Sequence, residues 1–162
     1  MNSLRTVSPN WARMVVQSLE KSGLNGKELC QKANIDYERL SNTDTRITQD
    51  SLTLLWQEAV ASSDNQAIGL SMGRPESVRA FDSLIFNIMS SQSLNDAYQY
   101  IIRYQHIIAD SIRIKVVKET EGYWVSFKLE GDALAVSDQS YDAIIATITS
   151  ITRWISLGEA AP

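Results

Sequence analysis

The sequence predicts an α+β fold: a mostly helical domain with a small antiparallel sheet, one hairpin, packed against the helices. Two observations lead to this prediction. Apolar residues recur at the three-and-four spacing of amphipathic helices along most of the chain, but they alternate with polar residues between positions 112 and 129. The 162 residues also suffice for one domain to bury a core without disulfides or metals. We therefore expect a single domain over residues 1–162.

The N-terminal part of the chain carries capping signals for two helices and a further turn. Ser8 followed by Pro9 starts the first helix, and Gly23 is placed to end it. Its apolar face consists of Trp11, Met14, Val15 and Leu19. A shorter helix is expected over residues 26–33, and residues 37–40 form one more helical turn that closes this lobe.

The strongest helix signal begins at Thr48, an N-cap residue preceded by the apolar Ile47. The apolar face of this helix consists of Leu52, Leu55, Trp56, Ala59 and Val60. The polar run from Ser62 to Asn65 ends it. Trp56, like Trp11 in the first helix, is therefore expected to be a core residue.

In the second half of the chain, Ser93 with Asp96 three positions later predicts the start of another helix. Alternation then predicts two strands, with Ile112, Ile114 and Val116 in one and Tyr123, Val125, Phe127 and Leu129 in the other. A turn around residues 118–122 joins them into a hairpin with one buried face. Because a lone hairpin is marginally stable, it needs the helices. The last helix carries Tyr141 to Ile155 at helical spacing and stops at Gly158.

Composition narrows the possible partners and locations. The net charge of -4 and the pI near 5.0 disfavour DNA binding by this chain, because protein–DNA affinity depends on basic side chains. The single cysteine, Cys30, cannot form an intramolecular disulfide and is expected to be a buried apolar residue. The apolar runs are too short and too often interrupted by charge for a membrane span, and no signal peptide is visible, so we expect a cytoplasmic protein.

No cluster of His, Cys, Asp and Glu has the spacing of a zinc site, and no calcium loop is present, so no metal or cofactor is expected. Residues 69–73 match the G-x-S-x-G pattern of a hydrolase nucleophile elbow, with Ser71 at its centre. That elbow needs a buried strand before the serine and a helix after it, whereas a polar stretch precedes this one and Arg74-Pro75 follows. We therefore expect turn glycines, no catalytic residue and no enzyme.

Residues 24–40 have the outline of a helix-turn-helix. A recognition helix offers basic and amide side chains to the major groove, whereas Asn34 is followed by Ile35, Asp36, Tyr37 and Glu38. The segment is therefore expected to contribute to core packing rather than to DNA contact.

Several short motifs occur in order along the chain. They are Arg46-Ile47, Leu55-Trp56, Asp64, Ile68-Gly69-Leu70 with Gly73, Ser90-Ser91, Ser93-Leu94, Ala97 and Arg103-Tyr104. From about Leu19 onward, the chain resembles the N-terminal effector domain of one branch of AraC-type transcription regulators. That branch is called "arabinose-binding" but is not the cupin barrel of the arabinose regulator itself. The segment at residues 79–83 departs from the family, which often has a glycine there.

This resemblance implies a domain that senses a small organic effector and self-associates as a homodimer. It also implies that DNA is bound only through a separate C-terminal helix-turn-helix domain, which is not visible here. Family members continue with further strands after the last helix, so we expect residues 1–162 to be a fragment. The alternative is a protein–protein interaction module without a small-molecule site.

Four residues are candidates for ligand binding. Trp124 faces away from the apolar residues beside it in the hairpin and is assigned to an interface or a pocket wall. Trp154 lies at the edge of the apolar face of the last helix, and Arg103 and Tyr104 are the nearest polar anchors. His106, close to both, is read as a residue at a helix C-terminus, where positive charge is favourable.

Overall fold

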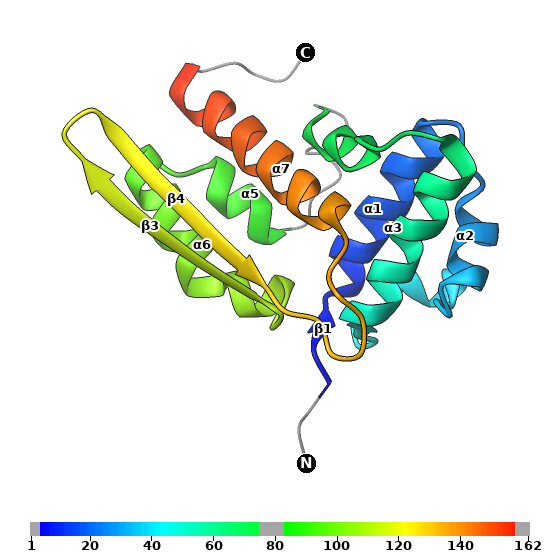
Figure 1. Cartoon of the computed structure of the whole chain (residues 1–162). Coiled ribbons are helices and arrows are strands. Elements are labelled where there is room, and N and C mark those ends of the chain that lie inside the picture. Colours follow the sequence, from blue (N-terminus) through cyan, green and yellow to red (C-terminus); the bar gives the residue numbers. More distant parts are fainter. Residues whose placement is uncertain (1–3, 75–82, 158–162) are drawn as a thin grey trace.

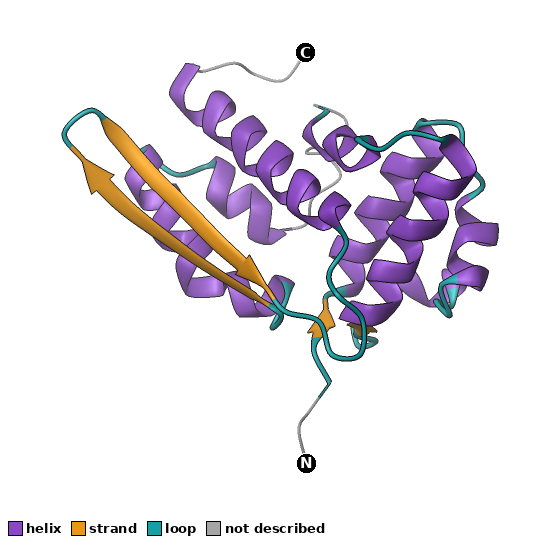
Figure 2. Cartoon of the chain, in the orientation of Figure 1, coloured by secondary structure: helices purple, strands orange, loops and turns teal. Residues whose placement is uncertain are grey.

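The computed structural model describes residues 4–74 and 83–157 (Figure 1). It confirms the α+β prediction, since helices dominate and two small antiparallel sheets accompany them (Figure 2). The predicted end of the last helix at Gly158 lies outside the described residues, as does most of the segment at 79–83 that departs from the family pattern.

The elements form two groups with one long helix, α7 (Asp138–Leu157), between them (Figure 1). The first group consists of α1 (Pro9–Lys21), α2 (Gly26–Lys32), η1 (Tyr37–Ser41), α3 (Gln49–Ser63) and η2 (Ile68–Gly73). The second group consists of α5 (Ser83–Met89), α6 (Leu94–Ile108), β3 (Ile112–Glu119) and β4 (Gly122–Leu129). The start of α7 precedes the predicted Tyr141 by three residues.

Three predicted helix starts are confirmed by their capping hydrogen bonds. The side-chain oxygens of Ser8, Thr48 and Ser93 each accept a hydrogen bond from the backbone N–H three residues later. The predicted end of the first helix is confirmed as well, because Gly23 has a φ of 90°, a conformation that favours glycine.

A second sheet, which the sequence analysis did not predict, joins the two groups. Strand β1 (Thr6–Val7) pairs antiparallel with β2 (Ile47–Thr48), and Val7 also bridges to Ala109 at the end of α6. The guanidinium of Arg46 fixes this junction, because Nε donates to Thr6 Oγ1 at 2.6 Å and a terminal nitrogen donates to the Ile107 carbonyl at 3.1 Å. Strands of two residues give too short an alternation to be recognised in sequence.

The predicted hairpin is confirmed, with Ile112 opposite Leu129 and Glu119 opposite Gly122 at the turn. Burial alternates along both strands, so one face packs inward and the other faces solvent. Helix α6 supports the inner face, since the side-chain Oε1 of Gln105 accepts a hydrogen bond from the backbone N–H of Ile114 at 2.6 Å.

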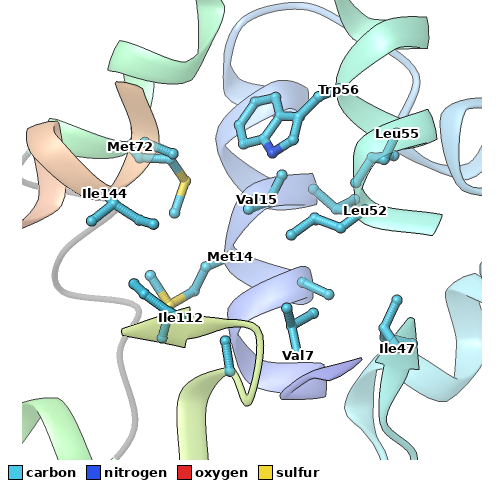
Figure 3. Close-up of a cluster of buried hydrophobic side chains, with 14 of the residues drawn as sticks. Val7, Met14, Val15, Ile47, Leu52, Leu55, Trp56, Met72, Ile112 and Ile144 are labelled. Atoms are coloured by element: carbon cyan, nitrogen blue, oxygen red, sulfur yellow. The ribbon is translucent and has the colours of Figure 1, made fainter. Parts of the chain in front are cut away.

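The core runs through both groups and α7. Figure 3 shows that α1, α3, β3 and α7 send side chains into a common interior, including Val15, Trp56, Ile112 and Ile144. Trp56 is completely buried, as its place on the helical face predicted. The interior therefore lies where α7 meets the two groups.

Candidate ligand-binding site

A cavity of about 70 Å³ lies inside this junction. Its wall is formed by α1, α3, α5, α6, the hairpin and α7, through residues that include Trp11, Leu52, Ile88, Ile101, Ile112 and Ile148. Most of the lining side chains are apolar, and none of the described residues that line it is charged. A mainly apolar cavity at the meeting point of several elements is the usual setting for a small-molecule site.

Four buried polar side chains interrupt this apolar wall. They are Gln49, Ser111, Ser140 and Thr147, all at most 5% exposed. The Ser111 hydroxyl donates to Gln49 Oε1 at 2.9 Å, and the Thr147 hydroxyl donates to the Ala143 carbonyl at 2.7 Å. Gln49 Nε2 and Ser140 Oγ have no hydrogen-bond partner among the described residues. Buried polar atoms in proteins normally have a partner, so these two atoms require an explanation.

Both residues are held in place by the first turns of their helices. Gln49 is the first residue of α3, directly after the Thr48 cap, and its backbone N–H donates to the Arg5 carbonyl at 2.9 Å. Ser140 lies in the first turn of α7, where its backbone N–H donates to the Ser137 carbonyl at 2.9 Å. The cavity wall therefore includes, from each of two helix N-termini, one residue with an unpartnered polar atom.

The segment that leads from β4 into α7 is tied to the start of α3. The Asp50 carboxylate accepts hydrogen bonds from the backbone N–H groups of Asp132, Ala133 and Leu134, at 3.2, 2.9 and 3.3 Å. Burial acts to raise the pKa of Asp50, but these three hydrogen bonds outweigh it and the pKa lies below its ordinary value. Asp50 directly follows Gln49, and residues 132–134 lead into α7, which carries Ser140. These hydrogen bonds therefore link the segment that carries Gln49 to the segment that leads to Ser140.

Ion pairs strengthen the same connection. Arg5 contacts Glu130 and Asp132, each at 2.8 Å, and Lys128 contacts Glu130 at 2.8 Å. Hydrogen bonds first from Lys128 and then from Arg5 lower the pKa of Glu130 to about 2. At neutral pH the Glu130 carboxylate is therefore ionised and paired with Arg5 and Lys128.

The four ligand-binding residues predicted from the sequence lie elsewhere. Arg103 is exposed on α6, and Tyr104 is half-buried with its ring centroid 4.5 Å from that of Tyr100. Trp154 is half-buried on α7, and Trp124 is 67% exposed on β4. None of the four lines the cavity, and the described residues show no hydrogen bond or ring contact between any two of them. Their role in ligand binding stays a prediction.

The hairpin's outer face explains the position of Trp124. As predicted, its side chain faces opposite to Tyr123 and Val125, which are half-buried. It pairs across the strands with Val117, which is 55% exposed, so a large apolar pair is open to solvent. An exposed apolar pair of this kind is typical of a contact surface, and both predicted roles of Trp124, in an interface or in a pocket wall, stay predictions.

The hydrolase pattern has a structural explanation. Ser71 lies in the 3₁₀-helix η2, not between a strand and a helix, and it is buried with its Oγ 2.7 Å from Ser18 Oγ. A side chain at Gly69 would overlap the backbone carbonyl of Gln139 on α7, and Gly73 also packs against α7. The glycines therefore permit close packing as well as a turn.

The structure also shows the surroundings of Cys30, of His106 and of the segment at residues 24–40. Cys30 is fully buried, and burial, with a smaller effect of Glu20, raises the pKa of its thiol to about 11. His106 is exposed in the last turn of α6. In the segment with helix-turn-helix outline, the second element is only the five-residue 3₁₀-helix η1, and Leu40 within it is buried. That segment packs into the core as expected.

Within residues 4–74 and 83–157, no group of three or more His, Cys, Asp or Glu side chains is arranged to hold a metal ion. No helix in the same ranges is long and apolar enough to cross a membrane.

The sequence signal for the cavity was weak. Gln49 and Ser140 are polar residues beside helix starts, where polar residues are common for reasons of capping. Trp11 was predicted to be a core residue and is half-buried at the cavity wall. No spacing rule would have placed these three residues around one cavity.

Comparison with known proteins gives one family. Residues 23–162 match the model of the arabinose-binding domain of AraC transcription regulators, an N-terminal domain of those proteins. A search of curated proteins found no match.

Proposed function

Because the chain belongs to the family of arabinose-binding N-terminal domains of AraC transcription regulators, we propose that it senses a small organic effector in the cavity beside α7. Domains of this family bind ligands for a regulator and are not enzymes. The observation that carries the proposal is that two residues in the wall of this mainly apolar cavity, Gln49 and Ser140, each have a buried polar atom without a partner among the described residues. Such a wall can both bury a ligand and orient it.

The size of the cavity suggests how binding would be transmitted. Its volume of about 70 Å³ is well below the several hundred Å³ typical of drug-sized ligand pockets. An effector larger than a few atoms would therefore move the walls apart. Because α7 contributes five of those wall residues, from Ser140 to Ile151, we expect α7 to shift relative to the two groups.

This shift would act as a population change between two arrangements of the domain, biased by the ligand's higher affinity for one of them. The arrangement would control a C-terminal helix-turn-helix domain, through which a cytoplasmic, self-associating regulator would bind DNA. The acidic composition of the present chain supports a separate DNA-binding domain.

The proposal is tested by filling the cavity. A thermal-shift screen of small organic compounds identifies ligands, because a compound that binds the native state raises the melting temperature with concentration. Ile148→Phe places extra volume at the cavity wall, whereas Ile145→Phe makes the same change on the 48%-exposed outer side of α7. We expect the shift to be lost in the first variant and kept in the second.

The four residues predicted from the sequence provide the competing site. A shift that is lost in Arg103→Ala or Trp124→Ala but kept in Ile148→Phe would move the effector to the outer surface of α6 and the hairpin. Retention of the shift in all three variants would exclude both sites.

The exposed Val117–Trp124 pair favours a second function, contact with another protein chain. Self-association of the domain is the form implied by the family resemblance. Sedimentation of the wild type and of Trp124→Ser over a range of concentrations tests it. A monomer at all concentrations in both proteins would argue against self-association through this face.

A further inference from the structure

Few of the polar side-chain atoms in the cavity wall lack a hydrogen-bond partner, and both of these atoms can donate. Gln49 Nε2 can only donate hydrogen bonds, and the Ser140 hydroxyl can donate one. The other polar side chains of the wall are already bonded. Gln105 Nε2 donates to the Ile102 carbonyl at 3.0 Å while its Oε1 accepts from Ile114, and Ser111 and Thr147 have the partners described above. The mainly apolar wall therefore has two unpartnered groups that can donate, and only the Ser140 hydroxyl among them can also accept.

An anionic ligand does not fit this wall. None of the described lining residues is Lys, Arg or His, so nothing in the cavity would compensate a buried carboxylate or phosphate. Burial of an uncompensated charge is strongly unfavourable. The nearby cation Arg5 is already paired with Glu130 and Asp132, and it does not line the cavity.

A free sugar does not fit either. Each hydroxyl of a pentose is both a donor and an acceptor, and burial would leave much of this hydrogen-bonding capacity unmet in a mainly apolar wall with two unpartnered polar atoms. The donors themselves call for an acceptor. One carbonyl oxygen has two lone pairs and can accept two hydrogen bonds.

We propose that the effector is an uncharged, mainly apolar molecule with a single hydrogen-bond-accepting group, such as a carbonyl, bound by Gln49 Nε2 and Ser140 Oγ. The inference rests on the proposed function, because it assumes that the cavity is the effector site. It adds the chemical class of the ligand and the two residues that select it. In the ligand-free protein both atoms are buried at the cost of their hydrogen bonds, and the ligand restores them.

The test uses probes that differ in one feature. Cyclopentanone carries the carbonyl, and methylenecyclopentane replaces its oxygen by a CH₂ group at nearly the same shape. Cyclopentanecarboxylate and arabinose represent the anionic and the sugar classes. Binding to the whole 162-residue chain is followed by NMR titration, and the side-chain amide signals of Gln49 are assigned by their loss in Gln49→Met.

The quantity of interest is the ratio of the dissociation constants of methylenecyclopentane and cyclopentanone. We expect Gln49→Met and Ser140→Ala each to lower this ratio by about 2- to 10-fold, the effect of one neutral hydrogen bond. Ser126→Ala, an exposed position on the outer face of the hairpin, should leave it unchanged. Cyclopentanone should also shift the Gln49 amide signals, and the carboxylate and arabinose should bind more weakly than the ketone.

The experiment distinguishes a wrong assignment of the ligand class from a wrong assignment of the binding site. If both cyclic probes bind in the cavity but neither variant changes the ratio, the two donors do not select the ligand and the inference is overturned while the effector site stands. Tighter binding of arabinose or of the carboxylate in the cavity overturns it too. If no probe perturbs residues of the cavity wall, the proposed effector site itself is rejected.

Discussion

Ser140→Ala should stabilise the ligand-free domain, although Ser140 is buried. The residue is 4% exposed and its hydroxyl has no partner among the described residues, so burial of the hydroxyl costs about 1–3 kcal/mol that the alanine would not incur. Removal of one oxygen from a cavity wall sacrifices few packing contacts. We therefore expect the free energy of unfolding to rise by about 1 kcal/mol, or the melting temperature to rise by about 2–4 °C.

Ser111→Ala is the matched control, since it is the same substitution at a residue that is 2% exposed and lines the same cavity. The Ser111 hydroxyl donates to Gln49 Oε1, so its removal leaves the Gln49 amide without a partner at both ends. This variant should lose about 1–3 kcal/mol. Urea unfolding of the three proteins gives both differences, provided that the slopes agree. Equal destabilisation by the two variants would refute the reasoning, because it would mean that Ser140 has a bonding partner.

Three further outcomes are expected. Gly69→Ala should lower the free energy of unfolding by at least about 1–3 kcal/mol, because its side chain would overlap the carbonyl of Gln139, and urea unfolding measures it. The contribution of ionised Asp50 to the free energy of unfolding should be complete above its ordinary pKa near 4 and be lost as pH falls through its lowered folded-state pKa. Asp50→Asn should therefore be less stable than the wild type at about pH 5, and this difference, measured by urea unfolding, should shrink towards about pH 2. A difference that stays constant with pH would contradict this prediction. Trp124→Ser should change the free energy of unfolding by less than about 0.5 kcal/mol because the side chain is 67% exposed, and a larger loss in thermal unfolding would place Trp124 in the core.

Local signals in the sequence were sufficient to predict the fold class and most elements. Ser8, Thr48 and Ser93 were recognised as helix caps because capping depends on residues only three positions apart. The hairpin was recognisable because alternation over eight residues in each strand has a distinct period. The short motifs also led to the correct family, with Ile68-Gly69-Leu70 lying where η2 packs against α7.

The cavity depends on contacts that local signals do not contain. Gln49 and Ser140 lie 91 positions apart in the sequence, and only the packing of α3 and α7 around one interior brings both into the wall of the same cavity. Whether a buried polar atom has a partner is also a property of the folded chain. The four residues predicted from the sequence were chosen for size and polarity, which identify exposed side chains such as Trp124 as readily as cavity walls.

The most direct test of the account is a structure of the domain bound to a compound that raises its melting temperature. We expect the compound to occupy the cavity between α3, α6 and α7, with its acceptor group within hydrogen-bonding distance of Gln49 Nε2 or Ser140 Oγ. A compound bound on the outer surface, beside Arg103 or Trp124, with the cavity unchanged, would contradict the central claim.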